Sequence, residues 1–193
     1  ACAIRDIMRK FKKEHNDLNK FPEKIAIQMN DTHPSLTVAE LMRMLVDENN
    51  LSWEKAWHIT VETLGYTNHT LLPEALEKWP VPLFEKVLPR HLQIIYEINH
   101  RFLQEAIKLR SDSGDIISKI SVIEESNPKQ VRMANLAIIG SHSINGVSAL
   151  HSELIKTSLV PEFYHMFPER FNNKTNGVTQ RRWLNQANPL LSG

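Results

Sequence analysis

The chain has 193 residues and a formal net charge of +1, from 23 Lys and Arg against 22 Asp and Glu, and 41% of its residues are hydrophobic. This composition supports a packed core, excludes a disordered chain, and argues against a protein that mainly binds nucleic acid or an anionic membrane. Because Cys2 is the single cysteine and no apolar run approaches the roughly 18 residues of a membrane span, we expect a cytoplasmic protein.

Apolar spacing in the first part of the chain predicts helices and one strand. A stripe of apolar residues indicates a helix over residues 4–15, and the apolar run 24–29 favours a buried strand. The sequence Thr37-Val-Ala-Glu40 matches a capping box, which predicts a helix that begins there. Ser52 is expected to cap the next helix, and several prolines then predict a mostly irregular stretch up to Pro89.

The second part of the chain contains the longest helical pattern, which follows Pro89 and is predicted to end at Ser111–Gly114. Residues 122–125 and 131–133 predict a β-hairpin, and shorter helices are expected over 134–139 and 150–156. The tail beyond them is predicted to be irregular. Because the predicted helices are long and the strands few, we expect a mainly helical part of an α/β domain.

Polar clusters follow apolar segments at four places, which is where sites on a rigid scaffold usually lie. Ligands collect at strand ends in open α/β sheets, and the first cluster directly follows the predicted strand. Each cluster also has a simpler interpretation: a turn capped by Asp31, a structural His69, a helix cap at Ser143 or Asn145, and an ordinary Asn-Gly turn. The clusters are Asn30–Pro34, Tyr66–Thr70, Gly140–Val147 and Lys174–Thr179.

Known motifs for metal and nucleotide binding are absent from these clusters. The sequence contains neither His-Glu-x-x-His nor paired Cys-x-x-Cys, so we expect no metal site. Residues 140–146 do not form a Gly-x-Gly-x-x-Gly loop, and the Gly-x-Ser-x-Gly elbow of hydrolases is also missing. From the residues alone, the chain is an α/β segment with several polar loops.

The same clusters, taken with their neighbours, closely resemble the glycogen and starch phosphorylases, which are pyridoxal-phosphate-dependent α-1,4-glucan phosphorylases. The match extends in order from about Ile4 to the C-terminus, and the segment Glu124-Glu-Ser-Asn-Pro128 looks bacterial rather than vertebrate. The matching segments are Asn30–Leu36, Tyr66–Glu77, Leu88–Asn99, Gly140–Val147 and Lys174–Val178.

This resemblance implies the fold and the activity. It implies a cytoplasmic glycosyltransferase of glycogen degradation, in a family that includes allosteric enzymes, which releases glucose 1-phosphate from glycogen, starch or maltodextrin with inorganic phosphate. The implied fold is of the glycosyltransferase B type, with two Rossmann-like domains. Residues 1–170 would be the second half of the N-terminal domain, and 171–193 the truncated start of the C-terminal, cofactor-binding domain. The longer parent is expected to be a homodimer.

The resemblance also implies residue roles. His69 corresponds to the active-site histidine, whose carbonyl faces the reacting sugar and whose ring binds the 6-hydroxyl, and Asn176 is the second partner of that hydroxyl. The residues implied to lie around the sugar are Asp31, His33, Glu74, Ala75 and Glu77 along the channel and Asn145, Gly146 and Val147 behind the ring. Those implied in a separate glucan storage site are Tyr96, Asn99 and Glu125. Gln180 departs from the family, where proline is usual.

The family's cofactor lysine and phosphate-binding residues have no counterpart in this chain, so no residue of it is expected to bind the cofactor. We therefore expect the 193-residue chain alone to be inactive, because sugar contacts by themselves do not supply the charges that stabilise the transition state. Two alternatives remain at this point. One is a non-catalytic carbohydrate-binding fragment, and the other is a structural or interaction fragment, for which exposed apolar surface predicts self-association.

Overall fold

A four-stranded parallel sheet forms the centre of the computed structural model, which describes residues 1–109 and 114–193. Its strands, in spatial order, are β1 (Ile27–Asn30), β2 (Leu64–Thr67), β6 (Ser143–Gly146) and β7 (Phe171–Asn173). Each neighbouring pair is parallel. All four carboxyl ends therefore lie at one edge of the sheet.

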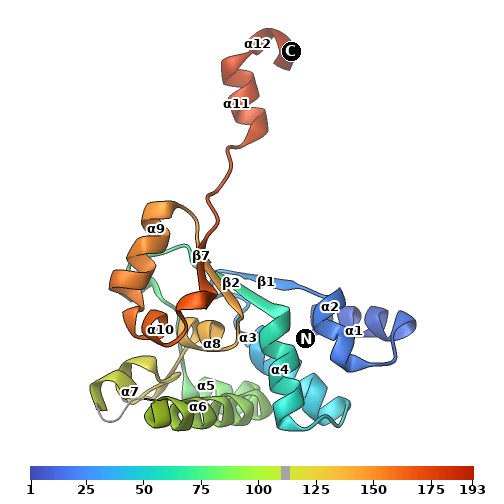
Figure 1. Cartoon of the computed structure of the whole chain (residues 1–193), viewed down its shortest axis with the longest axis vertical. Coiled ribbons are helices and arrows are strands. Elements are labelled where there is room, and N and C mark those ends of the chain that lie inside the picture. The colour runs from blue at the N-terminus through green and yellow to red at the C-terminus, as the bar shows by residue number, and fades with distance from the viewer. Residues whose placement is uncertain (110–113) are drawn as a thin grey trace.

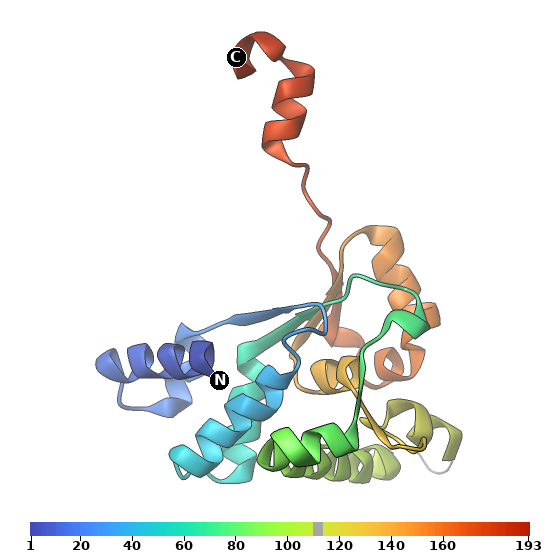
Figure 2. The same ribbon diagram turned by 180° about the vertical axis from the view of Figure 1, so that it is seen from behind.

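Helices make up most of the remaining chain. Those before the gap are α1 (Cys2–Glu14), α2 (Phe21–Lys24), α3 (Leu36–Arg43), α4 (Trp53–Thr63), α5 (Val81–Val87) and α6 (Pro89–Leu109). Those after it are α7 (Gly114–Ile120), α8 (Met133–Ile139), α9 (Ala149–Leu154), α10 (Pro161–Met166), α11 (Gln180–Ala187) and α12 (Pro189–Ser192). Helices α5, α6 and α7 lie together at the end of the molecule opposite to α11 and α12 (Figures 1 and 2). This mixed, mostly helical architecture confirms the predicted α/β class.

Burial of the sheet explains its sequence. Leu64, Gly65 and Tyr66 of the inner strand β2 are all buried, as expected when helices cover both faces of a parallel sheet. Helix α8 is buried along its whole length, which suits a segment without a charged side chain. The hydrophobic core thus fixes the strands whose ends carry the polar clusters.

A second, smaller sheet contains the predicted hairpin. Strands β4 (Ile123–Glu124) and β5 (Gln130–Arg132) are antiparallel, which confirms it, and β3 (Lys78–Pro80) pairs with the other side of β5. The stretch around the prolines is therefore more regular than predicted, because it forms β3 and α5. Glu124 Oε2 lies 2.7 Å from Lys78 Nζ and 2.9 Å from Arg132 Nε, so one carboxylate joins all three strands.

Several predicted helices are confirmed. Helix α1 buries Ile4, Met8 and Phe11, the apolar stripe of the first segment. Ser52 caps α4, its hydroxyl accepting from the N–H of Lys55 at 3.5 Å. Helices α6 and α8 also lie where the apolar spacing places them, and α9 continues into a π-helical turn, η4 (Ile155–Leu159).

Other predicted boundaries are wrong. The first strand begins at Ile27 rather than residue 24, because residues up to Lys24 form α2. The capping box at Thr37 does not form, since α3 has already begun at Leu36 and Glu40 is engaged elsewhere. The tail contains β7, α11 and α12 instead of irregular chain. The predicted helix end at Ser111–Gly114 lies outside the described residues, which resume where α7 begins.

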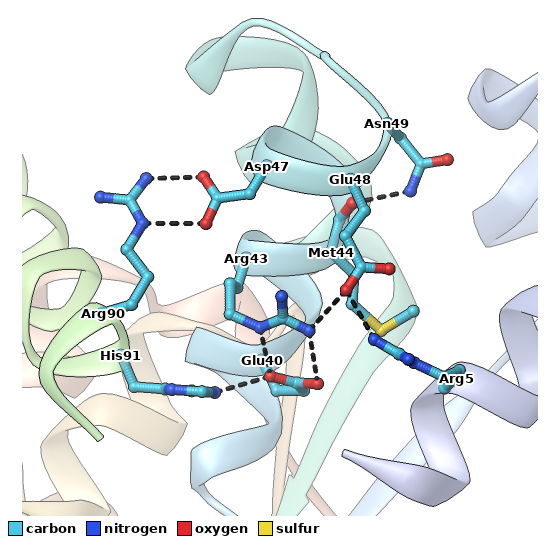
Figure 3. Close-up of polar contacts among 9 residues, drawn as sticks. All are labelled: Arg5, Glu40, Arg43, Met44, Asp47, Glu48, Asn49, Arg90 and His91. Carbon is cyan, nitrogen blue, oxygen red and sulfur yellow. Dashed lines mark hydrogen bonds and ion pairs between the residues drawn. The ribbon is translucent and has the colours of Figure 1, made fainter. Parts of the chain in front are cut away.

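A buried carboxylate joins α3 to α6 (Figure 3). Glu40 is 4% exposed, and its oxygens accept from Arg43 Nε at 2.8 Å and Arg43 Nη2 at 3.0 Å. His91 Nε2, from the first turns of α6, lies 2.6 Å from Glu40 Oε2. Arg43 also contacts Glu48 Oε1 at 2.8 Å, and so does Arg5 of α1. We call Glu40, Arg43 and His91 the Glu40 cluster; it connects α3 to α6.

The last twenty residues leave the body as an arm (Figures 1 and 2). Beyond Asn173 every residue is exposed, including apolar Trp183 and Leu190 on α11 and α12. Among the described residues, no helix is both long enough and apolar enough to cross a bilayer.

Candidate functional site

The four polar clusters meet at the carboxyl edge of the parallel sheet. The N–H of Asp31, just after β1, donates to Thr67 O at 2.9 Å, and the N–H of Asn68 donates to Asn145 O at 2.9 Å. On the other side of β6, the N–H of Asn176 donates to Val147 O at 3.0 Å. Backbone hydrogen bonds therefore align the loops that follow all four strands, and we call this region the strand-end site.

His69 is an exposed imidazole at this edge. Its Nε2 lies 2.5 Å from Oδ1 of Asn30, the last residue of β1. Because an amide oxygen can only accept, Nε2 carries the proton in this contact. The ring is thus oriented by the neighbouring strand, while Nδ1 has no partner among the described residues and can accept a hydrogen bond from a ligand.

Beneath His69 lies a layer of buried polar groups. Asn68 is 2% exposed, and its Oδ1 lies 3.0 Å from Nε2 of His151, which is 9% exposed. The N–H of Val147 donates to Nδ1 of the same ring at 3.1 Å. The pKa of His151 is below its ordinary value because burial disfavours the charged ring and His69 lies near it. The layer is therefore uncharged.

A second chain of hydrogen bonds crosses the sheet between side chains. Gln28 Nε2 donates to Thr67 Oγ1 at 2.9 Å, and that hydroxyl donates to Asn145 Oδ1 at 2.9 Å. Asn145 Nδ2 then donates to the carbonyl oxygen of Gly146 at 2.9 Å. Polar side chains on β1, β2 and β6 thus satisfy one another and hold the strand ends in register.

Gly146 allows α9 to begin directly beneath the edge. A Cβ at this position would lie 2.6 Å from Oγ and 2.9 Å from Cα of Ser152, closer than side chains approach. Ser148 then caps α9, its hydroxyl accepting from the N–H of His151 at 3.1 Å. The glycine is therefore required by close packing between β6 and α9.

Glu77 joins the loop after β2 to the loop after β1. Its Oε2 accepts from Thr32 Oγ1 at 2.8 Å, and its Oε1 accepts from Trp79 Nε1 at 3.3 Å. His33 Nδ1 is 3.8 Å from Glu77 Oε2. Asp31, between these groups and β1, has φ 64°, a conformation that favours glycine and costs free energy in other residues. Strain of this kind is common at binding sites.

The structure brings together most of the residues singled out in the sequence. His69, Asp31, Asn145, Gly146 and Val147 lie at or beside the strand ends, and Asn176 is anchored there by its backbone while its side chain is exposed. His33 and Glu77 lie to one side. Glu74 and Ala75 are exposed on a short turn, η3 (Pro73–Ala75), of the loop after β2.

Sequence reasoning missed the supporting residues. The sequence places Asn30 and Asn68 in polar clusters without giving either a role of its own, and it does not single out His151. Their partners are distant in the sequence, as with the 83 positions between Asn68 and His151. The one signal available was their position, with Asn30 and Asn68 inside a polar cluster and His151 four residues beyond Val147. Among the described residues, no group of three or more His, Cys, Asp or Glu side chains is placed to hold a metal.

Tyr96, Asn99 and Glu125 lie apart from the strand ends, next to the small antiparallel sheet. Asn99 is buried, and its Oδ1 accepts from the N–H of Val122 at 2.8 Å and from Ser121 Oγ at 3.3 Å. Tyr96 and Glu125 are exposed. Asn99 thus holds the segment that leads into the hairpin, whereas the side chains of Tyr96 and Glu125 face solvent.

In open α/β sheets ligands collect at the carboxyl ends of the strands, and in this chain that edge carries amide and imidazole side chains. The chain matches the family model of carbohydrate phosphorylases over residues 1–193 and belongs to that family. It is 55% identical over 192 residues to the glycogen phosphorylase of Synechocystis, covering 100% of this chain and 23% of that protein. It is 54% identical over 194 residues to glycogen phosphorylase of Saccharomyces cerevisiae, covering 100% of this chain and 22% of that protein.

The muscle form of glycogen phosphorylase from Ovis aries is 51% identical over 200 residues, covering 100% of this chain and 24% of that protein. The chain therefore spans about a quarter of the length of these relatives. The identities to these three relatives lie between 51% and 55%.

Proposed function

We propose that the chain is a segment of an α-1,4-glucan phosphorylase, a cytoplasmic glycosyltransferase that releases glucose 1-phosphate from glycogen, starch or maltodextrin with inorganic phosphate. One observation carries the proposal: all four polar clusters meet at one sheet edge, in a chain whose relatives are glycogen phosphorylases. A neutral, hydrogen-bonding edge suits a sugar, because hydroxyl groups need both donors and acceptors in fixed positions.

In this proposal His69 and Asn176 bind the 6-hydroxyl of the reacting glucosyl unit. The contact with Asn30 leaves Nδ1 of His69 available as an acceptor, and the exposed amide of Asn176 offers both a donor and an acceptor. Glycosyl transfer passes through a transition state with positive charge on the sugar ring. The uncharged amide of Asn176 and the carbonyl dipole of His69 facing the sugar would not oppose that charge.

The remaining site residues are proposed to surround the sugar. Val147, half-buried beside Asn145 and Gly146, would form the wall behind the ring. The channel would be lined from the other side by Asp31, His33, Glu74, Ala75 and Glu77. We also propose that the exposed Tyr96 and Glu125, supported by Asn99, contribute to a separate glucan storage site.

A second domain is proposed to cover the strand-end site. Leu72, Leu150 and Val178 follow β2, β6 and β7 and are 58%, 71% and 64% exposed, which is costly unless another surface covers them. We propose the two-domain glycosyltransferase B fold, with residues 1–170 in the N-terminal domain and 171–193 beginning the C-terminal domain. The exposed arm after β7 supports this division. The longer parent is proposed to be a homodimer.

The cofactor of this family, pyridoxal phosphate, is proposed to bind outside this chain. A phosphate group requires several cations or N–H donors in one place, whereas the strand-end site presents amides and imidazoles. The lysine nearest to the strand-end site in the sequence, Lys174, is exposed and donates to Asn172 Oδ1 at 2.5 Å. The residues present at this edge therefore do not fit the cofactor, and we assign it no ligand here.

The proposal is tested by measuring glucose 1-phosphate release from glycogen, starch and maltodextrin with inorganic phosphate. We expect activity from the longer protein that contains this chain and none from the 193-residue chain alone. A different outcome is that the chain is retarded in a glucan-containing gel while the longer protein shows no phosphorolysis. That outcome would support a non-catalytic carbohydrate-binding fragment. An inactive longer protein with no glucan affinity would leave the structural alternative.

A further inference from the structure

The imidazole of His151 is held between the ends of two strands in a single protonation state. The N–H of Val147, which can only donate, points to Nδ1 at 3.1 Å, and Asn68 Oδ1, which can only accept, lies 3.0 Å from Nε2. Nδ1 must therefore be unprotonated and Nε2 must carry the proton. Protonation of Nδ1 would remove the acceptor that Val147 uses.

Each partner of this ring is directly connected to a different side of the strand-end site. Asn68 precedes His69, and its side chain also contacts Tyr66 and the N–H of Thr70, at 3.2 Å in each case. Val147 accepts from the N–H of Asn176 at 3.0 Å. One side of His151 thus orients the backbone of His69, and the other side orients the segment that carries Asn176.

We propose that His151 is a positioning residue which, as its neutral Nε2–H tautomer, fixes the distance between the His69 and Val147–Asn176 sides of the sugar-binding edge. This inference rests on the proposed function of that edge. His151 itself is buried beneath the surface and would contact no substrate. Its effect would come through placement, because sugar-binding groups displaced by a fraction of an ångström lose much of their catalytic value.

The proposal distinguishes between substitutions that keep different parts of the ring. In His151→Asn the side-chain amide can occupy the place of Nδ1 and accept from Val147, but it does not reach Asn68. In His151→Gln the longer amide can reach Asn68, but it leaves the N–H of Val147 without an acceptor. His151→Phe keeps the shape of the ring and removes both hydrogen bonds.

The variants are measured in the longer phosphorylase that contains this chain, with His58→Gln, an exposed histidine on α4, as the matched control. We expect kcat to fall about tenfold for Asn and Gln and about a hundredfold for Phe, with KM for glucan and phosphate within about twofold. The control should be unchanged. A Phe variant with kcat within about twofold of wild type, or losses that occur in KM alone, would overturn the inference.

A second measurement does not depend on activity. Long-range ¹H–¹⁵N spectra of the 193-residue chain, in a sample with dispersed amide signals, report which nitrogen of each ring is protonated, and His151→Gln assigns the signal. We expect the Nε2–H tautomer at neutral pH, and an Nδ1–H or a cationic ring would overturn the inference.

The activity measurements separate the two proposals. If the wild-type enzyme releases no glucose 1-phosphate, the proposed function fails, whereas an active enzyme whose activity does not change in the variants refutes only the role of His151.

Discussion

The strand-end site and the Glu40 cluster are both polar regions of the same domain, but they are built in opposite ways. In the Glu40 cluster a charged carboxylate is almost fully buried, and both of its oxygens are occupied by Arg43 and His91. At the strand-end site the buried groups, Asn68 and His151, are uncharged, while His69 and Asn176 above them are exposed.

This difference separates a structural role from a binding role. The Glu40 cluster satisfies its own charges and has nothing left to offer a ligand, so it acts as a connection between α3 and α6. The strand-end site satisfies only its lower layer, which leaves oriented side chains at the surface. Burial of the supporting groups, together with exposure of the groups above them, is the pattern expected of a pre-organised ligand site.

The largest expected effect comes from Glu40→Ala, which leaves Arg43 and His91 without their buried partner. Removing one member of a buried ion pair typically costs about 3 kcal/mol or more of the free energy of unfolding. Urea unfolding of the 193-residue chain measures it. Glu54→Ala is the control, because Glu54 pairs with Arg101 at a surface position and is 72% exposed in its side chain. Equal losses in the two variants would contradict a structural role for the Glu40 cluster.

The pH dependence of stability gives the next effect. Burial raises the pKa of Glu40, but hydrogen bonds from Arg43 and His91 more than offset this and lower it from 4.5 to about 2. A lowered folded-state pKa contributes stability that is fully present above pH 4.5 and is lost as the pH falls towards 2. We therefore expect the stability difference between wild type and Glu40→Gln to shrink between pH 6 and pH 3, and a constant difference would refute this.

A smaller effect is expected from Thr32→Val, which removes the hydroxyl that donates to Glu77 while keeping the shape of the side chain. A lost hydrogen bond to a half-buried carboxylate costs about 1 kcal/mol in the free energy of unfolding. Cleavage of the loop after β2 by protease should also become faster, since Glu77 loses its hydrogen bond to the loop after β1. Thr175→Val on the exposed arm provides the control, and it should change neither quantity.

The smallest effect on stability is expected from His69→Ala. The ring of His69 is exposed and its hydrogen-bond partner, Asn30, is exposed as well, and such a side chain usually contributes within about 0.5 kcal/mol, so thermal unfolding should hardly change. If the strand-end site binds sugar, phosphorolysis by the longer protein should nevertheless fall about tenfold or more in kcat/KM. Full activity with normal stability would show that His69 is not part of the sugar-binding site. The proposed binding role of the strand-end site would then lose its support.

The helical part of the fold could be predicted because its signal is local. Ile4, Met8 and Phe11 lie on one face through a 3.6-residue period, and Ser52 caps α4 through a contact three residues away. Strands β2, β6 and β7 gave no such signal. They have three or four residues each, and in β6 the polar Ser143 and Asn145 take the place of an apolar run.

The residues of the candidate site could be proposed from the sequence, but their arrangement could not. His69 and Asn176 were found through resemblance to a family, which transfers residue identities without geometry. The roles of Asn30, Asn68 and His151 depend on strand neighbours that only the folded sheet defines. Glu40 shows the opposite case. The local capping-box pattern predicts that its side chain caps a helix that begins at Thr37, whereas in the structure it contacts Arg43 and the distant His91.

The strand order β1-β2-β6-β7 also constrains how the chain acquires its structure. The inner pair joins residues 78 positions apart, as between Thr67 and Asn145, with α6 and the small sheet between them. Pairing across so long an intervening segment carries a large loop-closure entropy and slows folding. During synthesis, the edge of β2 that pairs with β6 would stay exposed until β6 leaves the ribosome. Aggregation through this unpaired edge is therefore most probable in that interval.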